Sequence, residues 1–425
     1  MSEQKIVAFV EPSFYGVSFA RAAYEQGHQV IAIVSSKDNP AKYGYEGIYH
    51  DLLVADIRDG ESIYEAIAGS PYHGRLDALI PATDYASHLT AQAAERLGLR
   101  GVPYEAALRA RNKDLARQAY EEHGVPGAKY KKVGTLEEAI EAAGAIGYPV
   151  VLKPTNCASS QGVYFINSPE ELREAFGLLL EFKVTYMDFK VREEYLIEEY
   201  IDGQEFSVEL FLQEGTPVFS AVTEKLTSPL PYFVEVLHTL PTSVHREREE
   251  EIIDTAVKAL HAIGIVSGPS HVEVKLSAAG PRIIEVNGRP GGDQISSDLL
   301  VQSFGIDVFA ATVDYYLGTP VQLEPSRRRA SAIAYLTAER DGTVAGIEGV
   351  EALRESPYAV RSHISVRPGD RVAVARSSDD RLGYVITSAD TPKEAKEAAL
   401  ALVSRVTITY EEAQLPQAHG SLRRS

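Results

Sequence analysis

The sequence predicts a protein of mixed α/β and α+β class, with an N-terminal Rossmann-like parallel sheet, a central α+β region in two subdomains and a C-terminal α+β domain. Two observations predict this class. The first hundred residues alternate between buried-strand and helix patterns, as in KIVAFV, SFARAAYEQG and HQVIAIVSS. Beyond about residue 190 the pattern changes to strands in hairpin-like alternation. At 425 residues, the chain is long enough for about three domains.

We expect the N-terminal α/β domain to span residues 1–105, where DALIPAT and YASHLTAQAAERLG repeat the strand–helix pattern. The central domain is expected to span residues 106–322, divided into 106–190 and 191–322, and the C-terminal domain residues 323–425. EPSFYG follows the first strand where a dinucleotide site would require G-x-G-x-x-G. A dinucleotide site at this turn is therefore not expected.

The composition excludes several classes of protein. A net charge of -18 argues against a nucleic-acid or anionic-membrane surface, because both need a concentrated positive face. The single cysteine, Cys157, excludes a disulfide within the chain and a cysteine-built metal site. No apolar stretch reaches the roughly 18–20 residues that span a bilayer. The N-terminus has no signal-peptide pattern, so we expect a cytoplasmic protein.

A loop of small polar residues, 155–162, follows Lys153 and is a candidate phosphate site. Its backbone N–H groups can approach phosphate oxygens, Ser159 and Ser160 can donate hydrogen bonds, and the lysine supplies positive charge. Gly162 ends the loop. The pattern differs from a Walker A motif, and the alternative is a polar hairpin beside a surface lysine.

Two acidic residues are predicted to face each other across a hairpin. HVEVKL and PRIIEVN flank the turn SAAG, and one register places Glu273 opposite Glu285 and His271 opposite Asn287. Facing carboxylates destabilise a strand pair unless positive charge lies between them, and Mg²⁺ takes such oxygen ligands. Arg289 shares this face. The alternative is a solvated strand face.

A short extended connector, residues 198–201, can present backbone groups to an adenine edge, with the Glu205 carboxylate accepting from ribose hydroxyls. Alone this signal is weak, because glutamate-rich strand edges are common.

Taken in order, RNKDLAR, YPVVLKP, the serine–glycine loop, IEEYIDGQEFSVE and HVEVKL…IIEVNGRPGG resemble the ATP-grasp superfamily over about residues 1–320. The last hundred residues look like that family's trailing domain. The resemblance implies that ATP lies between the two central subdomains and that one or two Mg²⁺ ions bind, with Mn²⁺ as the alternative. It implies these roles: phosphate contacts for Lys113, Lys153, Ser159, Ser160 and Gly162; adenine contacts for Glu198, Glu199, Tyr200 and Ile201; a ribose contact for Glu205; metal binding for Glu273, Glu285 and Asn287; and stabilisation of the transferring phosphoryl group by Arg289.

Within the superfamily, TEKLTSPLPYFVEVLHTLP and NGRPGGDQI are similar to the L-amino-acid ligases, which make dipeptides or related amides. This similarity implies substrate contacts for Glu235, His238, Arg289, Gly291, Gly292 and Asp293, and a catalytic role for His271 as well as Arg289. A structural network is the alternative for Glu235 and His238. Better-known dipeptide ligases carry a bulky aromatic where Asp293 stands, so we expect a larger and more negative acid pocket.

The resemblance therefore implies an ATP- and Mg-dependent ligase. It would activate a carboxylate as an acyl-phosphate and join it to an amine, expected to be an amino acid, giving an amide or dipeptide with ADP and phosphate. The alternatives are a biotin-carboxylase-like or purine-biosynthesis ATP-grasp enzyme, or an ATP-binding module without turnover. The expected partners are a small carboxylate and an amine, and the resemblance also suggests a homodimer.

Overall fold

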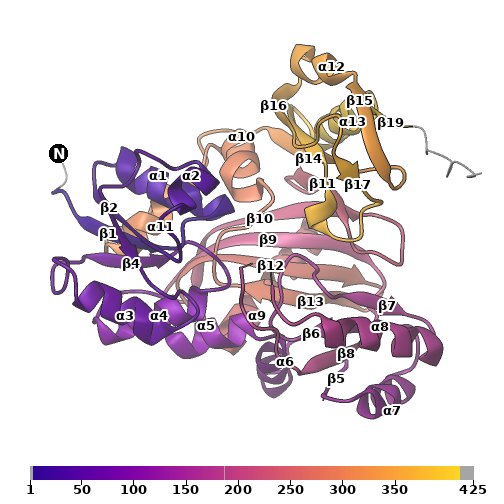
Figure 1. Cartoon of the computed structure of the whole chain (residues 1–425), viewed down its shortest axis with the longest axis horizontal. Helices are drawn as coiled ribbons and strands as arrows, with labels where there is room; N and C mark the ends of the chain where they lie inside the picture. Colours follow the sequence, from indigo (N-terminus) through magenta and orange to yellow (C-terminus); the bar gives the residue numbers. More distant parts are fainter. Residues whose placement is uncertain (1–2, 186, 412–425) are drawn as a thin grey trace, which may run out of the picture.

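The computed structural model describes residues 3–185 and 187–411. Figure 1 shows the N-terminal sheet on one side of a long central sheet, with a smaller sheet carrying α7 and α8 below it and the C-terminal region above it. The predicted mixed architecture with an N-terminal parallel sheet is confirmed. Among the described residues, no helix combines the length and apolar composition needed to cross a membrane.

The N-terminal sheet has the strand order β3–β2–β1–β4, and all its strands are parallel. Continuous apolar runs form these strands because helices cover both faces of a parallel sheet. Its elements are β1 (Ile6–Val10), η1 (Phe14–Gly16), α1 (Val17–Glu25), β2 (Gln29–Val34), α2 (Asn39–Tyr43), β3 (Asp51–Val54), α3 (Gly60–Ala68), β4 (Ala78–Pro81) and α4 (Ser87–Arg96). The carboxyl ends of β1 and β4 lie side by side, which is where such sheets place ligands.

The stretch from ALRAR to EEHG forms two helices, α5 (Tyr104–Arg111) and α6 (Lys113–Glu122). Asn112 interrupts them with an extended backbone, φ −110° and ψ 109°. The break is fixed by a tertiary contact, since the Lys113 N–H donates to the Thr155 carbonyl at 2.8 Å. It places Lys113 beside the predicted phosphate loop.

The first central subdomain is a four-stranded sheet in the order β5–β8–β6–β7, packed against two helices. Thr135 and Glu138 cap the first of these helices reciprocally. The elements are β5 (Tyr130–Val133), α7 (Leu136–Ile146), β6 (Val150–Pro154), β7 (Tyr164–Ile166), α8 (Pro169–Glu181) and β8 (Tyr195–Glu199).

An eight-stranded sheet forms the centre of the molecule, in the order β13–β12–β9–β10–β11–β14–β18–β16. Its first five strands and associated helices are β9 (Gln204–Gln213), β10 (Thr216–Thr227), β11 (Glu235–Leu240), α9 (Arg246–Ile263), β12 (Gly268–Ser277), β13 (Gly280–Asn287), η2 (Ile295–Leu299), α10 (Leu300–Phe304) and α11 (Val308–Tyr316). Helix α11 is buried between this sheet and the N-terminal domain, with Phe309 against Phe19 and Tyr315 against Phe211. It therefore fixes the N-terminal sheet relative to the central strands.

The C-terminal region continues the central sheet, because β14 pairs with β11. The boundary predicted at residues 322/323 precedes β14, so the sheet crosses it. The remaining elements are β14 (Ala330–Leu336), β15 (Gly342–Glu348), α12 (Val350–Glu355), β16 (Ala359–Ile364), β17 (Arg371–Val372), η3 (Ser378–Asp380), β18 (Gly383–Ala389), α13 (Pro392–Val403) and β19 (Thr407–Tyr410). A small sheet, β17–β15–β19, completes this region.

Candidate active site

One cavity of about 990 Å³ is lined by the segments that follow β1 and β4, the phosphate loop, the central sheet and the η3 turn. Nearly all of the predicted site residues line this cavity. The two exceptions are Gly162 and His238, which do not line it. Residues from four separate regions of the chain therefore share one site.

Lys153 lies on β6 at the end of the cavity predicted to hold the phosphates, with its Nζ 2.5 Å from Glu198 Oε2. Arg117 holds the other oxygen of Glu198 at 2.8 Å. Burial lowers the pKa of Lys153, and Arg117 and Lys113 lower it further, against the opposing effect of Glu198. The Glu198 carboxylate is therefore occupied by two cations, which leaves its backbone groups for the predicted adenine contact.

The phosphate loop is tied to the rest of the site by Lys113. The Lys113 ammonium donates to the Cys157 carbonyl at 2.7 Å and lies 3.0 Å from Glu285 Oε2. Ser159 and Ser160 both have a φ of +56°, a conformation that costs energy in residues other than glycine and recurs at ligand-binding loops. Gly162 has a φ of +71°, and a Cβ at this position would come too close to Leu179. A glycine is therefore favoured here.

The end of the cavity predicted to hold adenine is aromatic. Tyr200 packs edge-to-face on Phe165 at 4.8 Å, and Phe233 lies 6.5 Å from it at a tilt. Tyr200, Ile201 and Phe233 line the cavity, and the Lys275 ammonium lies over the Tyr200 ring. An apolar slot with polar groups at its edge suits a purine ring. Phe233 was not predicted, although it lies within the motif PYFVEV.

Two acidic residues at this end make ion pairs of their own. Glu199 pairs with Arg282 at 3.1 Å, and Glu205 lies 3.9 Å from Lys275. Burial raises the pKa of Glu205 to about 7.

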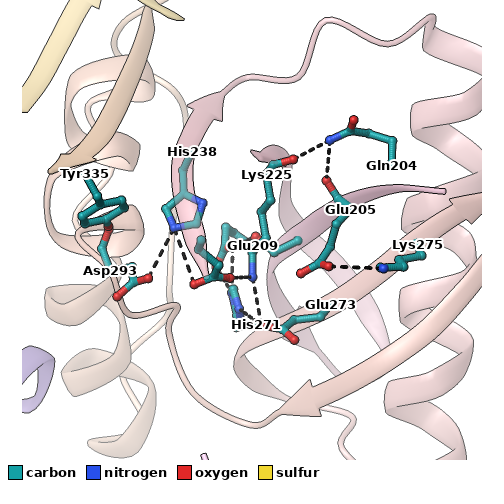
Figure 2. Close-up of polar contacts among 12 residues, drawn as sticks. Gln204, Glu205, Glu209, Lys225, His238, His271, Glu273, Lys275, Asp293 and Tyr335 are labelled. Atoms are coloured by element: carbon teal, nitrogen blue, oxygen red, sulfur yellow. Dashed lines mark hydrogen bonds and ion pairs between the residues drawn. The ribbon is translucent and has the colours of Figure 1, made fainter. Parts of the chain in front are cut away.

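Glu273 faces Glu285 and His271 faces Asn287 across β12 and β13, as predicted, but a β-bulge between Glu273 and Val274 shifts the register by one residue toward the turn. Two lysines supply the positive charge that this arrangement requires. Lys225 Nζ lies 2.9 Å from Glu273 Oε1, as Figure 2 shows, and Lys113 holds Glu285. Burial alone would lower the pKa of Lys225, but the surrounding glutamates raise it well above its ordinary value. Lys225 was missed, although it lies on β10 directly opposite Glu205.

The donor atoms at this hairpin fit a magnesium ion. Glu273, Glu285 and Asn287 offer only oxygen ligands from strands, which is what a hard cation prefers. Asn287 is buried, and none of the described residues hydrogen-bonds its side-chain amide. A second set, Glu235, His238 and Asp293, presents ligand atoms within 4.8 Å of one another. Lys225 and Arg381 already pair with its carboxylates, so we assign no metal there.

His271 is held between two carboxylates (Figure 2). Its Nδ1 lies 2.8 Å from Glu209 Oε1, and its Nε2 lies 3.6 Å from Glu273 Oε1. Burial lowers the pKa of His271, but the charge and hydrogen bond of Glu209 raise it to about 9. The imidazole is therefore a cation that orients Glu273. A Cβ at Gly291 would lie 2.7–2.8 Å from Glu209 and His271, so only glycine fits there.

Comparison with known proteins shows the family to which the chain belongs. Residues 146–298 match the ATP-grasp domain family, and residues 334–411 match the L-amino acid ligase C-terminal domain 2 family. Alanine–anticapsin ligase of Bacillus subtilis is 32% identical over 328 residues, which are 73% of this chain and 68% of that protein. The chain belongs to the ATP-grasp superfamily.

Other relatives are longer than this chain. A protein of Sinorhizobium fredii is 30% identical over 67% of this chain and 58% of its own length, and Gallus gallus carnosine synthase 1 is 28% identical over 94% of this chain and 44% of its own length. The chain thus spans about half the length of these two relatives. The crystal structure of an L-amino acid ligase from Bacillus licheniformis has the same fold, with a TM-score of 0.81 at 22% identity over 97% of this chain and 100% of that one.

In this ATP-grasp site, Arg289 is anchored by the N-terminal domain. Its Nε lies 2.9 Å from Asp84 Oδ1, and Arg111 lies 3.8 Å from the other oxygen. Burial raises the pKa of Asp84, but the two arginines lower it to about 2. Asp84 follows β4 and was missed, because nothing near it in the sequence indicates that it meets Arg289.

The end of the cavity predicted to bind the acid differs from the expectation. Arg381 Nη2 and Nη1 donate to the two oxygens of Asp293 at 2.7 and 2.8 Å, and His238 Nε2 lies 3.4 Å from that carboxylate. Burial alone would raise the pKa of Asp293, but Arg381 holds it well below its ordinary value. The more negative pocket predicted from Asp293 is wrong, because an arginine 88 residues away balances the charge.

Proposed function

We propose that this ATP-grasp protein uses ATP to activate a carboxylic acid and joins it to an amine, with an amino acid as the amine. One observation carries the proposal. Two lysines beside the phosphate loop, a set of oxygen ligands and an arginine all line one cavity: Lys113, Lys153, Glu273, Glu285, Asn287 and Arg289. The names of two relatives, alanine–anticapsin ligase and carnosine synthase, support amide formation between amino-acid-like molecules.

The reaction has two steps in this proposal. A carboxylate oxygen of the acid bonds to the γ-phosphorus of ATP, and the bond to ADP breaks. The amine nitrogen then bonds to the acyl carbon, phosphate leaves with the bonding pair, and the amine loses a proton. Lys113 and Lys153 bind the phosphates, while Arg289 neutralises charge on the transferring group. Magnesium held by Glu273, Glu285 and Asn287 would neutralise the phosphate oxygens.

The other charged residues position these groups. Asp84 holds Arg289 at the end of β4, and the Glu209–His271 pair fixes Glu273 on β12. Lys225 contacts Glu235 and Glu273 at 2.5 and 2.9 Å, so it fixes a substrate-side carboxylate and a metal-side carboxylate together. Such fixed geometry lowers the barrier by orienting the reactants and excluding water from the acyl-phosphate.

The test is ATP-dependent phosphate release, measured over pairs of amino acids and small dicarboxylic acids, with product masses recorded. We expect release only when an acid and an amine are both present, together with a product equal to their sum minus water. Release with bicarbonate alone or with a purine intermediate would instead favour the other ATP-grasp enzymes. ATP binding without release for any substrate would indicate a module without turnover.

A further inference from the structure

The C-terminal region contributes one wall of the cavity through the turn that contains η3. Asp379 accepts a hydrogen bond from Gln161 of the phosphate loop at 3.2 Å, and Arg381 pairs with Asp293. Ser378, Asp379 and Arg381 all line the cavity. The turn therefore contacts both the loop at the phosphates and the segment at the predicted acid pocket.

Arg381 is fixed in one orientation. Three of its five N–H groups are used: Nη1 and Nη2 donate to Asp293, and Nε donates to the Ser378 carbonyl at 2.7 Å. Its guanidinium stacks on the Tyr335 ring at 3.9 Å from the centroid. Tyr335 in turn donates to the Asp293 carbonyl at 2.9 Å. Figure 2 shows Asp293 between Tyr335 and His238.

Two N–H groups of Arg381, one on each Nη, have no acceptor among the residues that the structure describes. The Arg381 side chain is 12% exposed and lines the cavity, so a ligand bound in the cavity can displace water from these donors. A buried charged donor without an acceptor is costly, and a ligand that brings an oxygen atom relieves that cost.

We infer that Arg381 determines the specificity of the acid pocket and selects acids whose side chain ends in an oxygen acceptor. The inference rests on the proposed function for the identity of the acid as a substrate. An apolar side chain would cover the two free N–H groups without accepting from them. Because Asp293 already balances the arginine charge, a neutral carboxamide is accepted as well as a carboxylate.

Near-isosteric acids test the selection. We would measure equilibrium binding of asparagine, aspartate and leucine to the full-length protein in the presence of ADP and magnesium. We expect the wild type to bind asparagine and aspartate at least about tenfold more tightly than leucine. In Arg381→Met this preference falls to near unity, with the affinity for ADP unchanged.

Two further variants make the test specific. Arg381→Met combined with Asp293→Asn removes both charges of the pair, so loss of preference in this variant cannot come from an unpaired Asp293. Arg329→Met is the matched control, because Arg329 also pairs with an aspartate in the C-terminal region but does not line the cavity. We expect Arg329→Met to retain the wild-type ranking.

The outcomes separate this inference from the proposed function. Equal or tighter binding of leucine by the wild type, failure of every acid to bind, or a ranking that survives both Arg381 variants would overturn the specificity assignment. The expected ranking together with a lack of phosphate release for every amine would leave that assignment standing and overturn the proposed function instead.

Discussion

Two walls of the same cavity are built in different ways. The metal-side wall is an antiparallel strand pair, β12 and β13, with one β-bulge between Glu273 and Val274. The substrate-side wall brings Asp293, which follows β13, against Arg381, which precedes β18. Glu273 and Glu285 lie 12 positions apart in the chain, whereas Asp293 and Arg381 lie 88 apart.

The difference determines what each wall contributes. A strand pair repeats the same geometry wherever it occurs, so it suits the part of the site that handles phosphate and metal. A pair of loops from distant regions can change residue by residue without disturbing a ladder of hydrogen bonds, so it suits substrate selection. We therefore expect substitutions on the first wall to change catalysis and those on the second to change the ranking of substrates.

Lys153→Ala should have the largest effect. It removes a buried cation aimed at the phosphates and leaves Glu198 paired with Arg117 alone. Phosphate release at saturating ATP should fall by about 10³-fold, in line with the loss of a preorganised charge contact. Lys131→Ala is the control, because Lys131 is an exposed residue on β5 of the same sheet, and its phosphate release should equal that of the wild type. Near-wild-type turnover in Lys153→Ala would remove the phosphate assignment.

Asp84→Asn should reduce stability by about 3–5 kcal/mol, because it leaves Arg289 and Arg111 buried without their shared carboxylate. Urea unfolding monitored by circular dichroism measures the free energy of unfolding of both proteins. The folded pKa of Asp84, about 2, lies below its unfolded value, so the carboxylate stabilises the fold above the unfolded pKa. The difference between wild type and variant should therefore shrink as the pH falls toward 2. A difference that stays constant between pH 6 and pH 3 would contradict this account.

Glu285→Gln should lower phosphate release by about 10²-fold and raise the magnesium concentration needed for half-maximal rate, because a charged oxygen ligand is lost. Because Lys113 already compensates Glu285, removing this charge should lower the melting temperature rather than raise it. Magnesium titration and thermal unfolding measure the two effects. An unchanged magnesium requirement would show that the facing glutamates do not form the metal site.

Gln161→Ala should have the smallest effect. It removes an exposed hydrogen bond between the phosphate loop and the η3 turn, worth about 0.5–1.5 kcal/mol, and a longer one that Tyr85 donates to Gln161 at 3.4 Å. Since this contact joins the phosphate loop to the η3 turn, we expect KM for both ATP and the acid to rise by about threefold or less, with little change in kcat. A change confined to kcat would indicate that the contact acts in the chemical step and not in closing the cavity.

Much of the metal-side wall follows from the sequence alone. Alternation along HVEVKL and IIEVN favours the register that places Glu273 opposite Glu285 and His271 opposite Asn287, whereas the turn pairs Ser277 with Gly280 one residue out of that register and a β-bulge at Glu273/Val274 makes up the difference. The parallel order of the N-terminal strands follows in the same way from alternating strand and helix patterns. These features are local, because the period of a strand and the length of a turn are set by neighbouring residues.

Only the tertiary structure decided how the buried charges are balanced. Lys113, Lys225 and Arg381 reach their carboxylate partners from other elements, over separations of 172, 48 and 88 residues for Glu285, Glu273 and Asp293. The reason is physical: a carboxylate in a buried cavity needs a cation within a few ångströms, and which cation arrives depends on how whole sheets and helices pack. The sequence shows that a compensating charge must exist, and the packing of α6, β10 and the η3 turn decides where it comes from.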